Sequence, residues 1–355
     1  MGRAREVGRR DVLIGTASGM AIGFAGEGEA AKDTPPKPDR LVVNASGGAM
    51  GDAMKKAYVA VFERRTGIPI TLTSPNDLGK LKAMVESNNV EWNVTEINSA
   101  DARRACRLGL LEPVDDSIVD RSSYPGQARD LYLLTTSVYS TLLAYRTDAF
   151  KGRRPVTWSD FWDVKNFPGP RGMWNSPVDN LEIALVADGV EPENLYPLDV
   201  DRAFNKLSEI KPHVTVWWTS GAQHAQILVD KEVALCTGWN GRFYRVIKDG
   251  APIAVSWSQG IIKQAYFGIP KGAKDQYWGQ QFLAAMLDPK AQATFANLFV
   301  SPGLNPESLR YADPSIKAFL PTEPDNLRQQ FWQNDVWWDG NVEPIKERWQ
   351  RWILS

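Results

Sequence analysis

"LVVNASGGAMGDAMKKAYVAVFERRTGIPITLT" (residues 41–73) is the stretch of this 355-residue chain that decides its fold. It opens with a short apolar run that ends in small residues. Apolar side chains then recur every three or four positions, which predicts a helix from Ala49 to Thr66. Gly67 ends this helix, and a second strand-like run begins directly after it. A strand, a helix and a strand in succession predict a sheet of parallel strands covered by helices.

The same alternation continues beyond residue 73. Further strands are expected in "EWNVTEI", "SVYSTLLAYR", "HVTVWW", "EVALCTGW" and "IIKQAYFGIP", and one more is expected to end at "WSQG" (residues 257–260). Helices are expected in "LGKLKAMVES", "ADARRACRLGLL", "LEIALVADGV", "VDRAFNKLSEI", "QYWGQQFLAAMLD", "KAQATFANLF" and the tail from 325 to 354. Thr157 precedes another helical pattern, and a threonine in that position is a favoured N-cap.

Two long strand-like connections, near residues 143–146 and 262–269, divide the chain. They predict one lobe made of residues 40–143 plus 264–318 and a second lobe made of residues 144–263. Residues 319–355 are expected to pack across both lobes. Ligands of α/β sheets bind at the carboxyl ends of strands, and pockets favour domain interfaces, so the sequence predicts one ligand cleft between the lobes.

Composition argues against several functions. The 41 basic and 42 acidic residues give a formal charge of -1, so no basic field exists to hold nucleic acid. Fourteen tryptophans against two histidines favour packing and stacking over metal ligation. The chain contains no GxSxG, HExxH or CxxC pattern. We therefore expect a binding protein with no enzyme activity, no metal and no cofactor.

The N-terminus indicates export. Arg9 and Arg10 precede an apolar run over residues 12–24, which is too short to span a bilayer. Such a pattern is typical of a signal peptide, and the paired arginines favour the twin-arginine route. We expect residues 1–31 to be removed by cleavage near residue 30, with residues 32–39 as a Pro-rich linker. The mature protein is then periplasmic.

The two cysteines lie in unlike patterns. Cys106 falls in an expected helix and Cys236 in an expected strand far along the chain. An oxidising compartment would permit a disulfide between them, but two buried thiols fit these positions better.

Small residues follow the first expected strand. Ser46, Gly47 and Gly48 stand where that strand gives way to a helix. Backbone N–H groups at a helix start can hold an anion, which makes these three residues candidates for ligand binding. The alternative is a plain tight turn.

Tryptophans recur at the ends of the expected strands. The candidates for ligand contact here are Trp174, Trp218 with Ser220, Trp239 with Arg242, and Trp257. Side chains alternate along a strand, so Trp217 and Trp218 should face opposite ways, one into the lobe and one toward the cleft. The alternative for all of these rings is core packing.

Several of these stretches together resemble a known family. The signal, "NASGGAMGDAMKKAYVAVFERRTGI", "LLAYRTDAF", "GWNGR" and "WQNDV" resemble periplasmic solute-binding proteins of ABC transporters, and most of all the spermidine/putrescine-binding group. The resemblance covers roughly residues 40–350. It implies a two-lobed α/β periplasmic binding protein fold (type II), with a mixed sheet in each lobe and a two-strand hinge. It also implies closure on a small solute and delivery to a membrane permease driven by an ATPase.

The resemblance carries over to single residues. Trp239 matches a tryptophan that stacks on the ligand, and Gln333 matches a glutamine that contacts it. Asp179 keeps one half of an acidic pair that holds an amine. Lys263 stands where polyamine binders carry a tryptophan.

These departures change the expected charge of the ligand. A polyamine needs a carboxylate near each ammonium group, because an unpaired buried charge is costly. This chain has lost one acid and gained Lys263, while Arg242 offers a planar fork for a carboxylate. The resemblance therefore favours a GABA-like zwitterionic amino acid over a polyamine, unless Arg242 and Lys263 are solvated rim residues. The remaining alternatives are a sensor subunit that presents its ligand to a receptor and a thiaminase-like transferase on the same fold. We expect a monomer.

Overall fold

The computed structural model describes residues 34–150 and 152–355, and the chain divides into two compact units, residues 1–36 and 37–355. All of the described helices and strands belong to the second unit. The expected signal peptide (residues 1–31) lies outside the described residues. Within the described part, no helix has the length and apolar character needed to cross a membrane.

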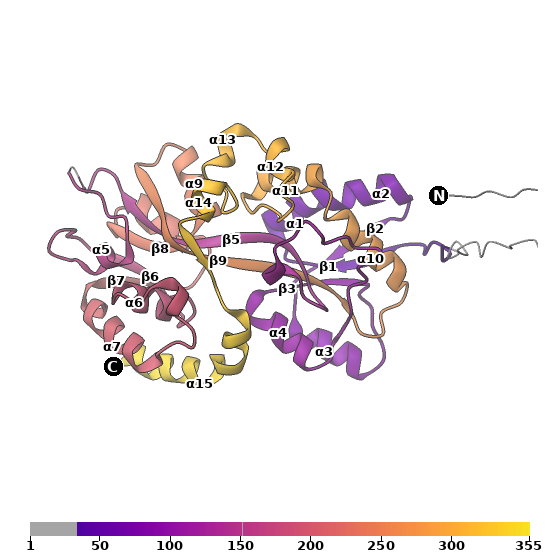
Figure 1. Ribbon diagram of the computed structural model, residues 1–355, viewed down its shortest axis with the longest axis horizontal. Coiled ribbons are helices and arrows are strands. Elements are labelled where there is room, and N and C mark those ends of the chain that lie inside the picture. The colour runs from indigo at the N-terminus through magenta and orange to yellow at the C-terminus, as the bar shows by residue number, and fades with distance from the viewer. Residues whose placement is uncertain (1–33, 151) are drawn as a thin grey trace, which may run out of the picture. The chain divides into compact units, whose positions relative to one another are not determined.

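The strands of the second unit form one mixed sheet (Figure 1), in the order β2-β1-β3-β9-β5-β8-β6-β7. β4 and β10 pair with β9. The strands are β1 (Leu41–Asn44), β2 (Ile70–Thr73), β3 (Val94–Ile97), β4 (Leu111–Glu112), β5 (Leu134–Arg146), β6 (Arg171–Trp174), β7 (Val214–Trp218), β8 (Leu235–Trp239), β9 (Ile253–Pro270) and β10 (Gln330–Trp332). β1 pairs in parallel with β2 and β3, and β6 pairs in parallel with β7 and β8. The α/β class predicted from the alternation is thus confirmed, but the strands form one sheet that runs through β9 and β5 and not a separate mixed sheet in each lobe.

Helices cover the sheet. The helices before β6 are α1 (Gly48–Met54), the π-helix η1 (Lys55–Val59), α2 (Ala60–Thr66), α3 (Leu78–Glu86), α4 (Ser99–Arg107), η2 (Gly126–Ala128) and α5 (Trp158–Trp162). Those between β6 and β9 are α6 (Asn180–Ala187), η3 (Pro192–Asn194), α7 (Val200–Ile210), η4 (Lys211–His213), α8 (Gln223–Val229) and α9 (Asn240–Lys248). After β9 come α10 (Gln276–Ala285), α11 (Pro289–Phe299), α12 (Ser308–Tyr311), α13 (Pro314–Lys317), α14 (Pro324–Leu327) and α15 (Asp335–Leu354).

Most of the expected elements are present. The helix predicted over residues 49–66 is helical throughout, with a π-helical segment, η1, between α1 and α2. Thr157 caps α5 as predicted, and its side chain and that of Asp160 form a reciprocal capping box. Cys106 lies in α4 and Cys236 in β8, and both are free thiols; Cys236 is buried as predicted, whereas Cys106 is only half-buried.

One expected strand end is wrong. Residues 257–260 do not end a strand but lie inside β9, an 18-residue strand. β5 pairs with β9 on both sides of this stretch, and the register shifts between Thr141 and Leu143, where residues 257–260 bulge out of the ladder. Gly260 pairs with Gln330 of β10 instead. Gln259 takes a left-handed φ of 60°, and Gly260 has no room for a Cβ, which would lie 2.8 Å from Leu142. β9 is therefore kinked at Gln259 and continues, where the sequence predicted that a strand ends at residue 260.

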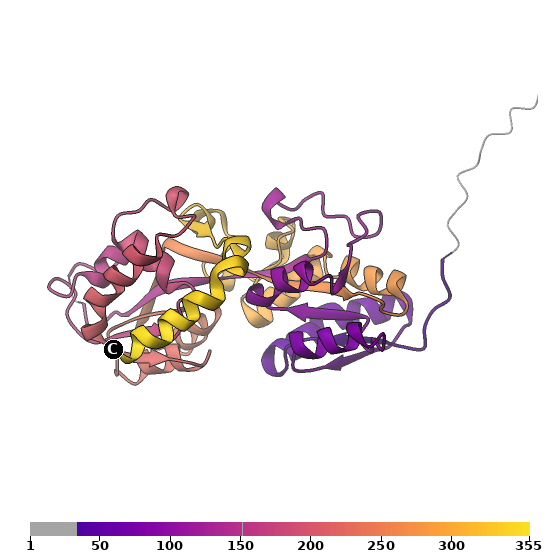
Figure 2. The same ribbon diagram turned by 90° about the horizontal axis from the view of Figure 1, so that it is seen from below.

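Two large apolar clusters lie on either side of the central strands. The first joins β1, α1, α2, α10 and α11, and includes Tyr58 and Phe282. The second joins α5, α6, α7 and α15, and includes Trp158 and Trp349. Figure 2 shows α15 running beside the helices of the second cluster. The exact lobe boundaries stay a prediction.

Candidate functional site

A buried ion pair lies at the centre of the second unit. The Nζ atom of Lys263, on β9, is 2.5 Å from Oδ2 of Asp179, which precedes α6. The side chains are only 3% and 2% exposed. Burial alone would lower the pKa of Lys263, but the charge of Asp179 and its hydrogen bond to Nζ outweigh burial, and the pKa of Lys263 is raised. The lysine is therefore a cation inside the protein.

Three aromatic rings surround this ammonium group. Nζ of Lys263 lies 5.0 Å from the ring centre of Tyr139 and 5.5 Å from those of Trp174 and Trp239. Tyr139 faces Lys263 directly across the β5–β9 ladder, and the tryptophans end β6 and β8. Distances under about 6 Å are those of cation–π contacts. We call Asp179, Tyr139, Trp174 and Trp239 the ammonium cage.

Asp179 is held in place by three donors. Its carboxylate accepts hydrogen bonds from Thr141 Oγ1 at 2.6 Å, Lys263 Nζ at 2.5 Å and Gln333 Nε2 at 2.9 Å. Asp179 has a φ of 70° and does not cap α6 with its side chain. An unusual backbone conformation of this kind turns the carboxylate toward the lysine. The structure thus brings together Asp179, Lys263 and Gln333, three of the residues predicted for ligand binding.

A second buried carboxylate adjoins the first. Oε1 of Glu182 accepts from Tyr196 Oη at 2.7 Å, Trp338 Nε1 at 2.6 Å and Gln333 Nε2 at 3.2 Å. Burial, followed by the charge of Asp179, raises the pKa of Glu182 to about 7. The sequence interpretation missed Glu182. Its position in the first turn of the expected helix that follows Asp179 was the available signal.

The tryptophan pair in β7 packs in both directions. Trp218 is 1% exposed, stacks on Trp174 at 5.7 Å and donates from Nε1 to Thr237 O. Trp218 therefore packs behind Trp174 of the cage. It is buried, and so it is not the exposed cleft wall for which the sequence made it a candidate. Trp217 packs against Trp349 and Trp352 of α15.

Trp239 is positioned by a histidine. Its backbone N–H donates to Nε2 of His224 at 3.1 Å. Burial lowers the pKa of His224 to about 3, so this imidazole is neutral and can accept. His224 therefore has a structural role beside the cage.

Arg242 lies beside Trp239 on α9. It is exposed and forms no ion pair with any described residue. A Cβ added to Gly221 would lie 2.9 Å from the Trp239 ring and 3.9 Å from Arg242 Nε, so the glycine lets this turn approach both side chains. Ser220, in the same turn, is exposed. An unpaired guanidinium next to an indole is an arrangement that can hold a carboxylate.

The turn after β1 differs from the anion site that the sequence predicted. The N–H of Ser46 donates to the Glu96 carboxylate at 2.5 Å, so this amide is already satisfied by an acid. A neighbouring carboxylate disfavours an anionic ligand group at Ser46, Gly47 and Gly48. Glu96 was also missed, although it stands near the end of an expected strand. Burial raises its pKa, while the bond from Ser46 opposes that shift.

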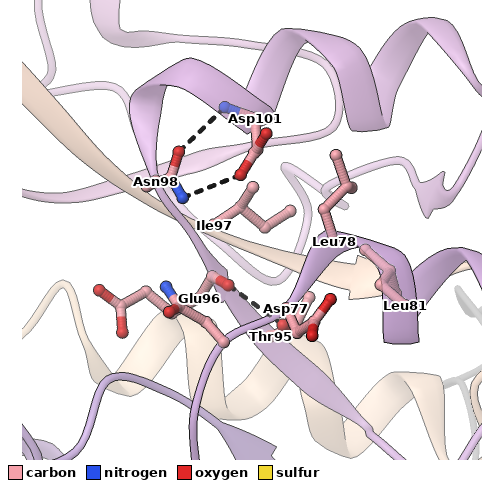
Figure 3. Close-up of a pocket in the computed structure, with 9 residues that line it drawn as sticks. Asp77, Leu78, Leu81, Thr95, Glu96, Ile97, Asn98 and Asp101 are labelled. Carbon is pink, nitrogen blue, oxygen red and sulfur yellow. Dashed lines mark hydrogen bonds between the residues drawn. The ribbon is translucent and has the colours of Figure 1, made fainter. Parts of the chain in front are cut away.

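A small hollow adjoins Glu96 at the carboxyl end of β3 (Figure 3). Its volume is about 10 Å³, which is room for one water molecule. Asn98 and Asp101 line it and bond to each other at the start of α4, and Asp77 caps α3 nearby. Trp257, in contrast, lies half-buried in β9 and is not one of the rings around Lys263.

Residues 57–318 match the family of bacterial extracellular solute-binding proteins. This chain belongs to that family. The solute-binding protein is 32% identical over 320 residues to the gamma-aminobutyric acid-binding protein of Pseudomonas aeruginosa, which covers 88% of this chain and 90% of the relative. It is 23% identical over 292 residues to the spermidine/putrescine-binding periplasmic protein 1 of Haemophilus influenzae, covering 78% and 79%.

Solved structures agree with this assignment. An ABC transporter substrate-binding protein from Bradyrhizobium japonicum has a TM-score of 0.83 and 38% identity, covering 89% of this chain and 99% of the other. The Atu4243-GABA receptor has a TM-score of 0.82 and 35% identity, covering 88% and 97%. The predicted periplasmic binding protein fold is therefore confirmed, and so is the predicted family of ABC transporter substrate-binding proteins. The family is one of solute-binding proteins and not of enzymes.

Proposed function

We propose that this protein is the exported, periplasmic component of an ABC importer and captures a small zwitterionic amino acid of the GABA type. The mature chain acts as a monomer that delivers this solute to the permease and ATPase at the inner membrane. The paired arginines near the N-terminus support export. Relatives whose names state GABA as their ligand, at 32% and 35% identity, support the solute class.

The observation that carries the proposal is Arg242. Its guanidinium is exposed, has no ion-pair partner among the described residues and lies beside Trp239. The indole Nε1 of Trp239 is buried, and its N–H has no acceptor among the described residues. The exposed guanidinium of Arg242 offers N–H groups in one plane, which suits the two oxygens of a carboxylate. A diamine offers no such group.

The ammonium end of the ligand needs a different partner from the one that the sequence indicated. Asp179 is already paired with Lys263, so it has no free charge for a ligand. Glu96 is a buried carboxylate near the end of β3 that accepts a hydrogen bond from Ser46. We assign Glu96 as the acidic partner of the ligand's ammonium group. A ligand held by Arg242 on one lobe and Glu96 on the other favours the closed state and pulls the lobes together.

The transferase alternative has little support. Cys236, the candidate nucleophile, is buried, and burial raises the pKa of its thiol well above the usual value. A thiol with a raised pKa holds little of the thiolate that attacks. The sensor alternative concerns partners outside this chain and shares the same ligand site.

Binding of GABA to residues 32–355, measured by titration calorimetry, tests the proposal. Arg242→Ala should weaken GABA binding by about 2–3 kcal/mol, a factor of 30 to 150, because it removes a charge-assisted pair. Arg245→Ala is the matched control, since Arg245 is an exposed arginine one turn along the same helix. Equal affinity of the two variants, or stronger binding of putrescine than of GABA by the native protein, would contradict the proposal.

A further inference from the structure

The Lys263 ammonium group occupies the kind of environment in which proteins hold a cationic ligand. One carboxylate lies 2.5 Å away and three ring faces lie within 5.5 Å. Aromatic faces around a carboxylate-paired cation form a common ammonium-recognition site. We propose that Lys263 is a resident occupant of an ammonium site and sets specificity by excluding the ammonium groups of solutes from it.

The cage is built independently of its occupant. Trp174 is fixed by stacking on Trp218, and Trp239 by its bond to His224. Asp179 keeps two donors, Thr141 and Gln333, besides the lysine. The four cage groups come from β5, β6, the start of α6 and the end of β8. Removal of the lysine side chain should therefore leave a site of the right shape and charge for another ammonium ion.

Exclusion follows from charge and burial. The cage carries one negative charge, and Lys263 already neutralises it in a place that is 3% exposed. A second ammonium group would share that carboxylate with a like charge, or would have to expel the lysine, and both are costly in a buried site. Arg242, beside Trp239, is exposed, and we assign it to the carboxylate end of the solute. Only this last step rests on the proposed function.

Chemical rescue of Lys263→Ala tests the inference. Alanine keeps Cβ, so the missing atoms from Cγ to Nζ equal one n-propylammonium ion. We expect this ion to raise the melting temperature of Lys263→Ala and to bind it about tenfold or more tightly than it binds the native protein. 1-Propanol, which has the same length but no charge, should not do so.

Two variants control for indirect effects. Lys271→Ala removes an exposed lysine just beyond β9 and should respond to n-propylammonium like the native protein. Lys263→Ala combined with Asp179→Asn should lose the rescue, because the cage then has no charge to pair. Rescue by 1-propanol to the same extent, or rescue in Lys271→Ala, would overturn the proposal. No natural solute is involved, so this result is independent of the Arg242 test.

A measurement on the native protein covers the case in which Lys263→Ala fails to fold. Reductive dimethylation modifies accessible, uncharged lysine amines and is read by peptide mass spectrometry. Lys263 should react about tenfold or more slowly than Lys271, and putrescine should not accelerate its reaction. Reaction at equal rates, or exposure of Lys263 by putrescine, would mean that solutes displace the lysine and would overturn its role as a resident.

Discussion

At the scale of single residues, Glu182 makes the stability of the folded protein depend on pH. Its pKa is raised from 4.5 to about 7, with burial as the largest cause. Between those values the folded protein keeps a proton that the unfolded chain has released. The free energy of unfolding therefore falls as pH rises from about 4.5 to 7.

Glu182→Gln removes this fall in stability with rising pH, because a glutamine side chain does not titrate. The Gln carbonyl oxygen can accept the bonds that now reach Oε1 from Tyr196, Trp338 and Gln333. We expect the variant to gain up to about 3 kcal/mol over the native protein between pH 5 and pH 8. Urea unfolding at both pH values measures this gain. Glu193→Gln, at an exposed position, should show no such change with pH. A gain independent of pH would contradict the assignment.

At the scale of elements, α15 ties the C-terminus to the second apolar cluster. Trp349 is 3% exposed, packs against Trp217 and donates from Nε1 to Asn175. Trp349→Ala should lower the free energy of unfolding by about 3–5 kcal/mol, because it leaves a cavity in that cluster. Leu354→Ala on the same helix removes a side chain that is 88% exposed and should change stability by less than about 0.5 kcal/mol. Denaturant titrations of both variants check this, and similar losses would argue against tight packing of α15.

The helices and strands were largely predictable, because the spacing of apolar residues that identifies them extends over only a few positions. Apolar spacing indicated the helices and long strands, and Thr157 was identified as a cap from its residue type. β10 was missed because a three-residue strand has no period to detect. The kink at Gln259 was interpreted as a strand end, since only the pairing of β9 with β5 on both sides of the kink, and with β10 at Gly260, shows that the strand continues.

The site was predictable only in part. Trp174, Asp179, Trp239 and Lys263 were named from strand ends and from the family resemblance. Their arrangement was not, because Lys263 and Asp179 lie 84 residues apart and only the folded sheet brings them together. Burial of Trp218 and the carboxylate of Glu96 opposite Ser46 also depend on long-range packing. The sequence could therefore indicate which side chains matter but not which of them are already paired.

At the scale of the whole second unit, three segments connect the two apolar clusters. β5 and β9 pair along most of their length, and β10 pairs with β9 at Gly260–Ile262. Just beyond β10, Gln333 bonds to Asp179, while Asp335 accepts from Tyr266 on β9 at 2.6 Å. Both apolar clusters therefore contain residues of β5 and β9.

We expect residues 37–355 to unfold in one cooperative step despite having two large clusters. Loss of either cluster would release β5 and β9, which carry residues of both. Scanning calorimetry should give a calorimetric enthalpy equal to the van't Hoff enthalpy. Two resolved transitions would mean that the lobes unfold independently.

The adjacent tryptophans of β7 have a practical consequence. Trp217 contacts Trp352, three residues from the C-terminal Ser355, while Trp218 stacks on a ring of the ammonium cage. A reporter dye attached to a cysteine introduced at position 355 would thus sit a few side chains from the cage. With Cys106 replaced, such a dye tests whether solute binding changes the surroundings of the chain end, and it leaves the solute site free of label.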